Sequence, residues 1–574
     1  MSGKSKGLAR FQWRVRTILG CLIAVALLLI ARLYFVQVVN GAEYRAAAEG
    51  QYTSTGAAAE ARGDIYFTEK DGRAYAAAVM RSGYKIAIQP SVLENPEKVY
   101  GLLNEVTPIS KERFFAAVAK TTDPYEEVAT RVDEEAGRIV RDMELLGVVV
   151  SHDRWRFYPA QERAAQTLGF VGFQGHERVG RYGLERYWQD TLKRNPHELY
   201  GNFFADIFAN IEGLAATTSA EGGDVITTIE PTVAQRLEDV LHKIDETYSP
   251  KLSGGIVMDP KTGAIIAMSA TPSFDPNKYN EVTSPAVFSN PMVESVFELG
   301  SIMKPLTVAA GIDAGVINAG TTYNDTGCIT RSEFRVCNFD HIARGRVAMQ
   351  EVLSQSLNTG ATYVAEKLGF DRFAQYVRAY GLGEETGIDV PNEVRGKLAG
   401  LDSGSAVDLA SASFGQGIAL TPIAMTRALA SLANGGILPE PHVVDRIVYP
   451  SGLSKKTWHM GETRVISAAA AEETTRMLVE VVDTALLKGK VKQAGYSIAA
   501  KTGTAQIAQQ GGGYSADKYL HSFFGYFPAH DPKFVVFLFT VEPKNVEYAS
   551  QTLTEPFMDL AKFLISYYDI PPDR

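Results

Sequence analysis

Two residues with complementary chemistry, Ser301 and Lys304, stand three positions apart in the sequence. If a helix begins at Gly300 and Ser301, Lys304 lies one turn further along the same face, and its amine comes close to the serine hydroxyl. A serine is a weak nucleophile until a base takes its proton, and a lysine serves as that base only when burial or nearby cations lower its pKa. The pair therefore predicts a nucleophilic serine, and backbone N–H groups at the helix start could stabilise a developing oxyanion.

This spacing alone is not distinctive, because Ser82 with Lys85 and Ser515 with Lys518 share it. The surrounding sequence predicts the start of a strand at Ser82 and a glycine-rich loop at Ser515. Neither pair is therefore expected on a helix, but Ser301 still needs support from other residues, since most such pairs simply lie on helix surfaces.

The second motif is Ser356 and Asn358, the only Ser-x-Asn in the chain, between two segments with helical patterns. A loop between helices could direct a hydroxyl and an amide into a cleft, although a helix cap explains this tripeptide equally simply. The third motif is a run of four residues in or beside a predicted strand: Lys501, Thr502, Gly503 and Thr504. Glycine within a strand permits the close approach of a ligand backbone, and the lysine and threonines could hold a carboxylate.

A second Lys-Thr-Gly, at residues 261–263, lies between two apolar strand runs and is predicted to be a hairpin turn. The combination of motifs is more specific than any one of them. Ser-x-x-Lys, Ser-x-Asn and Lys-Thr-Gly, in this order and in helical, loop and strand contexts, are the signature of penicillin-recognising serine enzymes.

The elements that must position these motifs extend over residues 222–574. Strand patterns occur early, in a hairpin at residues 253–270, and late, in two apolar runs within 521–542, whereas residues 291–440 are predicted to be mostly helical. This order predicts an α+β domain whose sheet is built from non-adjacent pieces of chain. Residues 40–221 mix helical and extended patterns, including an amphipathic helix with Ile139, Met143 and Leu146 on one face, and are predicted to be a supporting or docking region.

The length of 574 residues predicts several domains, and the net charge of −9 argues against a nucleic-acid partner. Cys328 and Cys337 are either disulfide-bonded or two separate thiols, and their spacing does not decide between these.

Basic residues precede an apolar run at 18–31 that continues beyond Arg32. We favour a membrane anchor at 17–39 with a cytoplasmic tail at 1–16, over a cleaved signal peptide or a buried soluble helix.

The chain resembles class B penicillin-binding proteins, the single-pass transpeptidases of bacterial cell-wall synthesis, over nearly its whole length. The resemblance is carried by FELGSIMKPLTV, FGQGIALTPIAM, KTGTAQ and FFGYFPAHDPKFVVFLFTVEP, and by Arg62-Gly63-Asp64-Ile65 and Gly183-Leu184-Glu185. After Ile65 the family usually continues with an Asp-Arg-Asn-Gly turn, whereas this chain reads YFTEKDG. The resemblance implies a catalytic domain with an antiparallel sheet flanked by helices at 222–574, after an α+β pedestal domain at 40–221.

The resemblance also implies catalytic roles. Ser301 would attack the penultimate D-Ala carbonyl of a stem peptide and expel the terminal D-Ala, with Lys304 as the base for acylation. Ser356 would relay a proton to the leaving amine, supported by Lys501. An amine from a neighbouring strand would then take the acyl group, and β-lactams would acylate Ser301 as mimics of D-Ala-D-Ala.

Other residues are implied to bind the substrate. Asn358 would hold the substrate amide, and Thr502 and Thr504 would bind the terminal carboxylate beside Gly503. The backbone N–H groups of Ser301 and Thr504 would form the oxyanion hole. No metal or organic cofactor is implied.

FELGSIMKPLTV and TGIDVPNEVRGKL are more similar to the division-type, septal enzymes than to the elongation type. The implied partners are a membrane glycosyltransferase and other divisome proteins, and the implied location is the bacterial inner membrane with the catalytic domain on its outer, periplasmic side. Two alternatives remain: a hydrolase with the same site, either a D,D-carboxypeptidase or a β-lactamase, and a non-enzymatic β-lactam sensor or divisome scaffold.

Overall fold

The computed structural model describes residues 62–175, 177–194, 222–331, 333–509 and 513–574. The predicted tail and anchor at residues 1–39 lie outside these ranges. Within them, none of the helices combines the length and the apolar character that crossing a bilayer requires. The described residues form two compact units, one of residues 82–154 and one of residues 62–81 with 155–574.

The smaller unit packs three helices against strands. Its elements are the second half of β2 (Ala74–Ile88), α3 (Pro96–Val106), α4 (Lys111–Val118), β3 (Glu126–Val132), α5 (Glu134–Asp142) and the first part of β4 (Val148–Phe157). Strand β2 pairs antiparallel with β3, and the unit has a hydrophobic core of its own, which includes Ile86, Leu103 and Phe114.

The amphipathic stripe predicted for α5 is wrong. Ile139 and Leu146 are 45% and 61% exposed, and the helix ends at Asp142, before Leu146. The buried face instead carries Gly137 and Val140. A β-carbon at position 137 would lie 2.2 Å from Cδ2 of Tyr84, so the glycine is what lets that ring pack against the helix.

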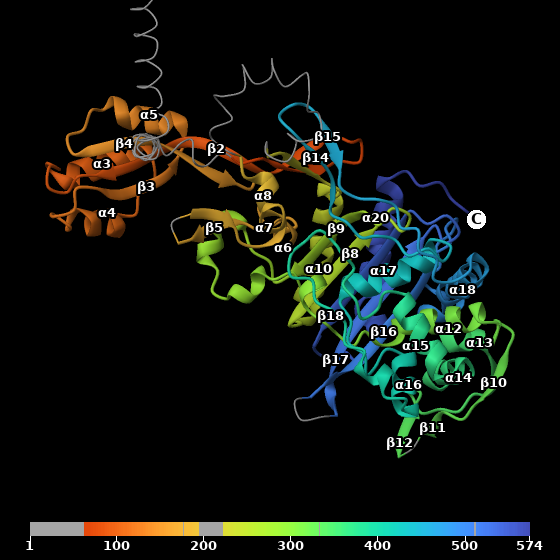
Figure 1. Ribbon diagram of the computed structural model, residues 1–574. Helices are drawn as coiled ribbons and strands as arrows, with labels where there is room; N and C mark the ends of the chain where they lie inside the picture. Colours follow the sequence, from red (N-terminus) through yellow and green to blue (C-terminus); the bar gives the residue numbers. More distant parts are fainter. Residues whose placement is uncertain (1–61, 176, 195–221, 332, 510–512) are drawn as a thin grey trace, which may run out of the picture. The chain divides into compact units, whose positions relative to one another are not determined.

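The larger unit is built around a five-stranded antiparallel sheet in the order β16-β17-β18-β8-β9 (Figure 1). The strands are β8 (Leu252–Met258), β9 (Ile265–Thr271), β16 (Ala499–Ala508), β17 (Tyr514–Phe527) and β18 (Phe534–Val541). The hairpin predicted at 253–270 and the assembly of one sheet from distant pieces of chain are confirmed. Ser515 lies in strand β17, so the loop predicted there is wrong.

Both faces of this sheet are covered by helices, which explains why β18 is buried along nearly its whole length. On one face lies α10 (Pro231–Tyr248), where Leu237 fills the space beside Gly255 of β8. The same face receives α20 (Thr554–Tyr567), whose Phe557 packs against Gly525 of β17.

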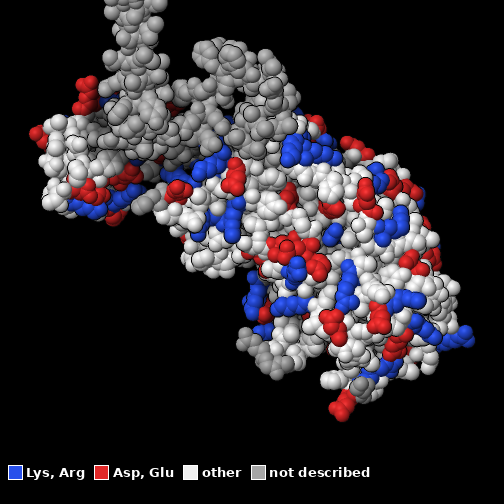
Figure 2. All heavy atoms as spheres, in the orientation of Figure 1, with Lys and Arg blue, Asp and Glu red and all other residues white. Residues whose placement is uncertain are grey.

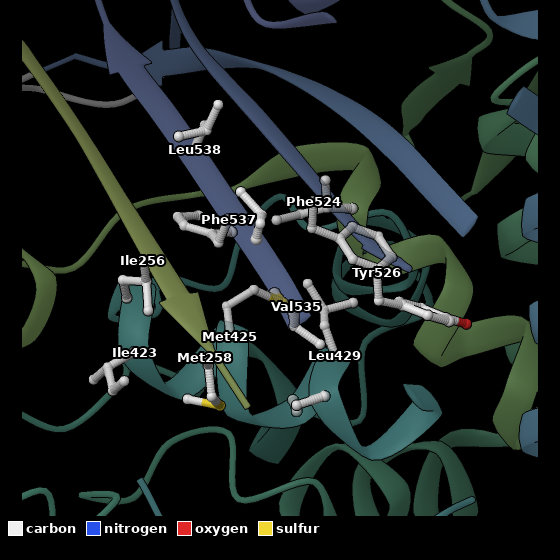
Figure 3. Close-up of a cluster of buried hydrophobic side chains, with 14 of the residues drawn as sticks. Ile256, Met258, Ile423, Met425, Leu429, Phe524, Tyr526, Val535, Phe537 and Leu538 are labelled. Atoms are coloured by element: carbon white, nitrogen blue, oxygen red, sulfur yellow. The ribbon is translucent and has the colours of Figure 1, made fainter. Parts of the chain in front are cut away.

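The opposite face packs against α17 (Pro422–Ala433) and α18 (Ala468–Glu480). Figure 3 shows side chains of β8, β17 and β18, among them Ile256, Phe524 and Phe537, in one apolar layer with Met425 and Leu429 of α17. The aromatic and β-branched residues of these strands thus form the main core of the unit.

A mostly helical part lies between β9 and α17. Its helices are η2 (Pro276–Glu281), η3 (Pro285–Phe288), α11 (Pro291–Glu294), η4 (Gly300–Met303), α12 (Lys304–Asp313), α13 (Met349–Ser354), α14 (Asn358–Leu368), α15 (Phe370–Ala379), η5 (Ala399–Asp402) and α16 (Ala406–Ser413). Four short strands, which the sequence analysis missed, interrupt it: β10 (Thr322–Asp325), β11 (Cys328–Arg331), β12 (Phe334–Cys337) and β13 (Gly345–Ala348). Cys328 and Cys337 face each other across the β11–β12 hairpin and form a disulfide.

The larger unit also contains strands of a second, seven-stranded sheet, which join the beginning of the described chain to residues 444–456. It contains β1 (Ile65–Thr68), the first part of β2, β7 (Asp224–Thr227), β14 (Val444–Val448) and β15 (Ser454–Lys456). The remaining elements are α6 (Ala165–Leu168), β5 (Val171–Gln174), β6 (Glu177–Gly180), α7 (Gly183–Tyr187), α8 (Gln189–Leu192), η6 (Val481–Ala485), η7 (Leu486–Gly489) and α19 (Ala549–Thr552).

The motifs Arg62-Gly63-Asp64-Ile65 and Gly183-Leu184-Glu185 meet in a buried ion cluster. Arg62 Nε donates to Glu185 Oε2 at 2.6 Å, and Arg156 Nε donates to Glu185 Oε1 at 2.6 Å. Glu185 is fully buried, and a buried carboxylate is stable only when its charge is paired in this way.

On the outside, basic and acidic side chains are interspersed over the face of the described chain that Figure 2 shows.

Candidate active site

Ser301 lies in the first turn of a helix, as predicted. It follows Gly300, which opens the 3₁₀ turn η4, and η4 continues directly into α12 at Lys304. Gly300 has a φ of +65°, and its N–H donates to the carbonyl of Gly415 at 3.1 Å. A side chain at position 300 would be strained and would meet the backbone of Thr504, so glycine is required immediately before Ser301.

Lys304 begins α12 and is completely buried. Its Nζ donates to the carbonyl oxygen of Ser356 at 2.5 Å and to Ser356 Oγ at 3.0 Å. Burial, and after it the charge of Lys501, lower the pKa of Lys304 well below its usual value. This is the condition under which a lysine can act as a base near neutral pH.

Ser356 occupies the short connection between α13 and α14, as expected for the Ser-x-Asn motif. Its φ of +55° is unusual for a residue with a side chain. The hydroxyl accepts hydrogen bonds from Lys304 on one side and from Lys501, also at 3.0 Å, on the other. One hydroxyl therefore joins all three motifs.

Lys501 lies on β16 and is only 2% exposed. Besides Ser356, its Nζ contacts the carbonyl oxygen of Thr502 at 2.9 Å. Burial lowers the pKa of Lys501 to about 7. Two amines with lowered pKa values thus share one hydroxyl, an arrangement suited to passing a proton between them.

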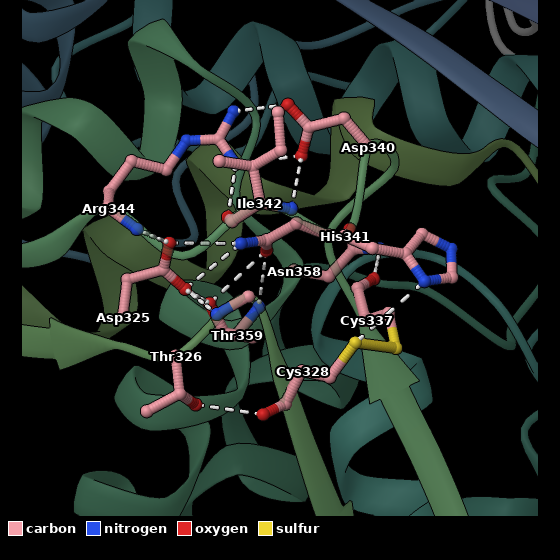
Figure 4. The surroundings of a disulfide bond; sticks show 12 residues. Asp325, Thr326, Cys328, Cys337, Asp340, His341, Ile342, Arg344, Asn358 and Thr359 are labelled. Atoms are coloured by element: carbon pink, nitrogen blue, oxygen red, sulfur yellow. Dashed lines mark hydrogen bonds and ion pairs between the residues drawn. A yellow bond between two sulfur atoms is a disulfide. The ribbon is translucent and has the colours of Figure 1, made fainter.

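Asn358 is the first residue of α14, and its side chain does not cap that helix. Its Nδ2 donates to the carbonyl oxygen of Cys337 at 2.8 Å, which ties the amide to the end of the disulfide hairpin (Figure 4). The direction of this side chain is therefore set by a segment 21 residues upstream.

Thr502, Gly503 and Thr504 extend along β16, the edge strand of the main sheet. A β-carbon at Gly503 would lie 2.7 Å from the carbonyl oxygen of Leu299 and 3.1 Å from the nitrogen of Ile302. The missing side chain therefore lets β16 pack directly against the turn that carries Ser301. Both threonines are half-buried, and Thr504 Oγ1 accepts a hydrogen bond from the N–H of Ala549 at 3.1 Å.

Sequence reasoning missed Ser522 on β17. Its Oγ donates to the carbonyl oxygen of Leu299 at 2.7 Å, two residues before Ser301, and it is fully buried. A single serine in the apolar run HSFFGYF is the signal that could have suggested it, because a buried hydroxyl needs a partner.

The sequence matches the family described as the penicillin-binding protein transpeptidase domain over residues 254–561, which is more than half of the chain. It also matches the penicillin-binding protein dimerisation domain over residues 58–196. This chain belongs to the penicillin-binding protein transpeptidase family. With both matches, it combines the two domains of a class B, division-type penicillin-binding protein.

Relatives of the family match along most of their own lengths. Stage V sporulation protein D of Bacillus subtilis (strain 168) is 28% identical over 93% of this chain and 82% of the relative. The peptidoglycan D,D-transpeptidase FtsI homolog of Mesostigma viride is 26% identical over 95% and 94%.

Among solved structures, penicillin-binding protein 3 of Mycobacterium tuberculosis complexed with aztreonam is 25% identical, with a TM-score of 0.64, over 74% of this chain and 92% of that one. Penicillin-binding protein 2X of Streptococcus thermophilus has a TM-score of 0.71 at 21% identity, over 89% and 81%. The fold of this chain is thus the penicillin-binding transpeptidase fold.

Proposed function

We propose that this chain is a peptidoglycan D,D-transpeptidase that cross-links stem peptides through an acyl-enzyme on Ser301. The observation that carries the proposal is the hydroxyl of Ser356, which accepts hydrogen bonds from Lys304 and Lys501, two buried amines with lowered pKa values. Further support comes from relatives that are named peptidoglycan D,D-transpeptidases.

In the first half-reaction, Lys304 takes the proton of Ser301, and Ser301 Oγ forms a bond to the carbonyl carbon of the penultimate D-Ala. The C–N bond to the terminal D-Ala then breaks, and the leaving nitrogen receives a proton from Lys304 by way of the Ser356 hydroxyl. Lys501, which contacts the same hydroxyl, supports this transfer. A base that receives a proton in one step and returns it in the next needs a pKa below that of an ordinary lysine, and burial lowers the pKa of Lys304 in this direction.

In the second half-reaction, the amine of a neighbouring stem peptide attacks the Ser301 ester. Lys304, neutral again after the first half-reaction, takes a proton from this amine as the new C–N bond forms. The bond from the carbonyl carbon to Ser301 Oγ breaks, and Lys304 returns the proton to that oxygen. The N–H groups of Ser301 and Thr504 stabilise the oxyanion in both halves. Thr502 and Thr504 bind the terminal carboxylate. Thr504 Oγ1 accepts a hydrogen bond from the Ala549 N–H. The Thr504 hydroxyl hydrogen therefore points away from Ala549 and is suited to donate to that carboxylate.

Asn358 holds the substrate amide. Its Nδ2 is bound by Cys337, so Oδ1 is the atom suited to accept a substrate N–H. β-Lactams acylate Ser301 in the same way as the substrate. The solved complex of the related penicillin-binding protein 3 with aztreonam supports this part of the proposal.

The test is labelling with fluorescent penicillin. We expect one labelled peptide, which contains Ser301, and loss of at least about 10³-fold in the acylation rate in Ser301→Ala, as expected when a nucleophile is removed. Ser82→Ala is the matched control, because Ser82 has the same spacing to a lysine but lies on strand β2, and it should label normally. Labelling that persists in Ser301→Ala would overturn the proposal, and rapid release of the label would favour a hydrolase.

The proposed setting is septal wall synthesis. The segment at 17–39 anchors the chain in the bacterial inner membrane, the catalytic unit lies on the outer side, and a membrane glycosyltransferase and other divisome proteins are its partners. A fluorescent fusion should accumulate at the septum. A signal along the sidewall would instead support an elongation-type enzyme, and a soluble fusion would contradict the anchor.

A further inference from the structure

A buried carboxylate, Asp325, lies at the end of β10 and is 1% exposed. Its Oδ1 accepts hydrogen bonds from Thr359 Oγ1 at 2.7 Å and from the Gly327 N–H at 3.1 Å. Asn338 Nδ2 lies 2.9 Å from Oδ1 and 3.1 Å from Oδ2, and the Arg344 N–H donates to Oδ2 at 3.0 Å. Figure 4 shows Asp325 with Thr359 and Arg344, two of these partners. The side chain makes none of the contacts assigned above to the reaction.

Two of these partners lead to the Ser-x-Asn motif. Thr359 directly follows Asn358, and its N–H donates to Asn338 Oδ1 at 3.2 Å. Asn358 itself is bound by the carbonyl of Cys337, the residue before Asn338. Two consecutive residues of the hairpin end therefore hold two consecutive residues of the first turn of α14, and Asp325 binds one residue from each pair.

The third partner reaches the other side of the motif. Arg344, whose N–H binds Asp325, donates from Nε to Gln355 Oε1 at 2.9 Å. Its guanidinium is held in turn by Asp340, through two hydrogen bonds of 2.7 and 2.6 Å. Gln355 is the residue immediately before Ser356, so the connection between α13 and α14 is held at both ends.

This connection needs such support, because Ser356 has a positive φ. Residues with side chains adopt that conformation at a cost in free energy and keep it only when the surroundings enforce it. Asp325 is suited to enforce this conformation. Burial alone would raise the pKa of its carboxyl, but the hydrogen bonds that it accepts, of which that from Thr359 has the largest effect, lower the pKa below its usual value. The carboxylate thus stays charged and binds its donors strongly.

We propose that Asp325 is a positioning residue for acylation: through Thr359, Asn338 and Arg344 it holds the segment 355–359, so that the Ser356 hydroxyl lies between the two lysines and Asn358 faces the substrate. This inference rests on the proposed function. It assigns to Asp325 no contact with substrate or with the reacting atoms.

The test measures the acylation rate constant and the binding constant for fluorescent penicillin separately, together with the melting temperature. Asp325→Asn places an amide NH₂ among groups that donate hydrogen bonds, and should lower the acylation rate constant about 10- to 100-fold, the loss expected from a displacement near 1 Å. Thr359→Val, which keeps the shape but loses the hydroxyl, should act in the same direction. Thr359→Ser, which keeps the hydroxyl, should stay within about threefold of the wild type.

Asp389→Asn is the matched control for a general loss of stability. Asp389 is a half-buried carboxylate that likewise accepts backbone hydrogen bonds, but from the N–H groups of Val443 and Val444 at the β14 end of the unit. At an equal loss of melting temperature, this variant should acylate normally. The inference is overturned if Asp389→Asn slows acylation as much as Asp325→Asn does, or if Asp325→Asn and Thr359→Val acylate at the wild-type rate.

Thr359→Val also keeps the test decisive if Asp325→Asn does not fold, because the hydroxyl-free variant retains the carboxylate. A wild-type chain that is not labelled at Ser301 would refute the proposed function. Normal labelling of the wild type together with undiminished labelling of both variants would refute only the role of Asp325.

Discussion

Two identical tripeptides, Lys261-Thr262-Gly263 and Lys501-Thr502-Gly503, have opposite surroundings in the larger unit. The first forms the turn between β8 and β9, and the exposed Lys261 pairs with Asp531 on the surface. The second lies within edge strand β16, and the buried Lys501 contacts the Ser356 hydroxyl. The tripeptide therefore does not carry the chemistry by itself. Burial of the amine and a hydroxyl partner make the second copy a candidate for catalysis.

Replacing each of the two lysines by methionine gives the largest expected difference in acylation rate. Lys501→Met should lower the acylation rate by about 10²- to 10⁴-fold, the usual contribution of a group that takes part in proton transfer. Lys261→Met, at an exposed turn, should change it less than twofold. Stopped-flow labelling with fluorescent penicillin measures both, and equal losses in the two variants would remove the distinction between the copies.

Substituting alanine for the glycine of each copy should affect different properties: acylation for Gly503 and stability for Gly263. Gly503→Ala would place a β-carbon 2.7 Å from the carbonyl of Leu299, push β16 away from the Ser301 turn, and lower acylation about 10²-fold. Gly263→Ala would force alanine to a φ of +83° against the Glu440 backbone. That change should cost about 1–3 kcal/mol of unfolding free energy and leave acylation intact in the folded protein. Urea unfolding and labelling of the same preparations separate the two outcomes.

The pH dependence of stability should distinguish the two lysines as well. The pKa of Lys501 is about 7 in the folded chain and 10.5 without burial, so between these values the unfolded chain binds more protons. Its contribution to the unfolding free energy is therefore present above pH 10.5 and is lost as the pH falls to 7, by at most about 1.4 kcal/mol per pH unit.

Urea unfolding at pH 7, 8 and 9 should consequently show a smaller rise in stability with pH for Lys501→Met than for the wild type, whereas Lys261→Met should keep the wild-type slope. Lys304, whose pKa is also lowered, contributes in the same direction and remains in both variants. An unchanged slope in Lys501→Met would show that its amine is not desolvated.

The smallest effect is expected at the exposed ion pair. The side chains of Lys261 and Asp531 are 47% and 65% exposed, and such pairs contribute about 0–1 kcal/mol. Asp531→Asn should therefore lower the unfolding free energy by less than about 1 kcal/mol, and by still less in high salt. A larger loss would mean that the first copy has a structural role beyond its turn.

The sequence predicted those features that local patterns specify. The hairpin at 253–270 and the strands around residues 521–542 have strong apolar runs, and the turn of the first Lys-Thr-Gly follows from its position between two of them. The resemblance also implied that Lys501 lies near Ser356, and the structure places these two side chains within hydrogen-bond distance. The contact of Lys304 with the same hydroxyl was not predicted.

What the sequence did not predict depends on contacts between distant residues. Strands β10 to β13 have four residues each, too few for a recognisable period. Asp325 stands in a stretch that resembles an ordinary turn, and its partners Asn338 and Thr359 are 13 and 34 residues away. The disulfide follows from the register that pairs Cys328 with Cys337, and this register is visible only once the hairpin is folded. The stripe on α5 failed for two reasons: Met143 and Leu146 lie beyond the last helical residue, and Ile139, inside the helix, is exposed while Gly137 and Val140 are buried.

The strand order of the main sheet also determines when that sheet can form during synthesis. Strand β18 separates the β8–β9 hairpin from the β16–β17 hairpin, so a nascent chain that stops before residue 534 holds two hairpins and no shared sheet. Pairing over such long sequence separations is slow compared with local folding. The five-stranded sheet, with Lys501 on its edge strand, is therefore completed only after translation has passed residue 541.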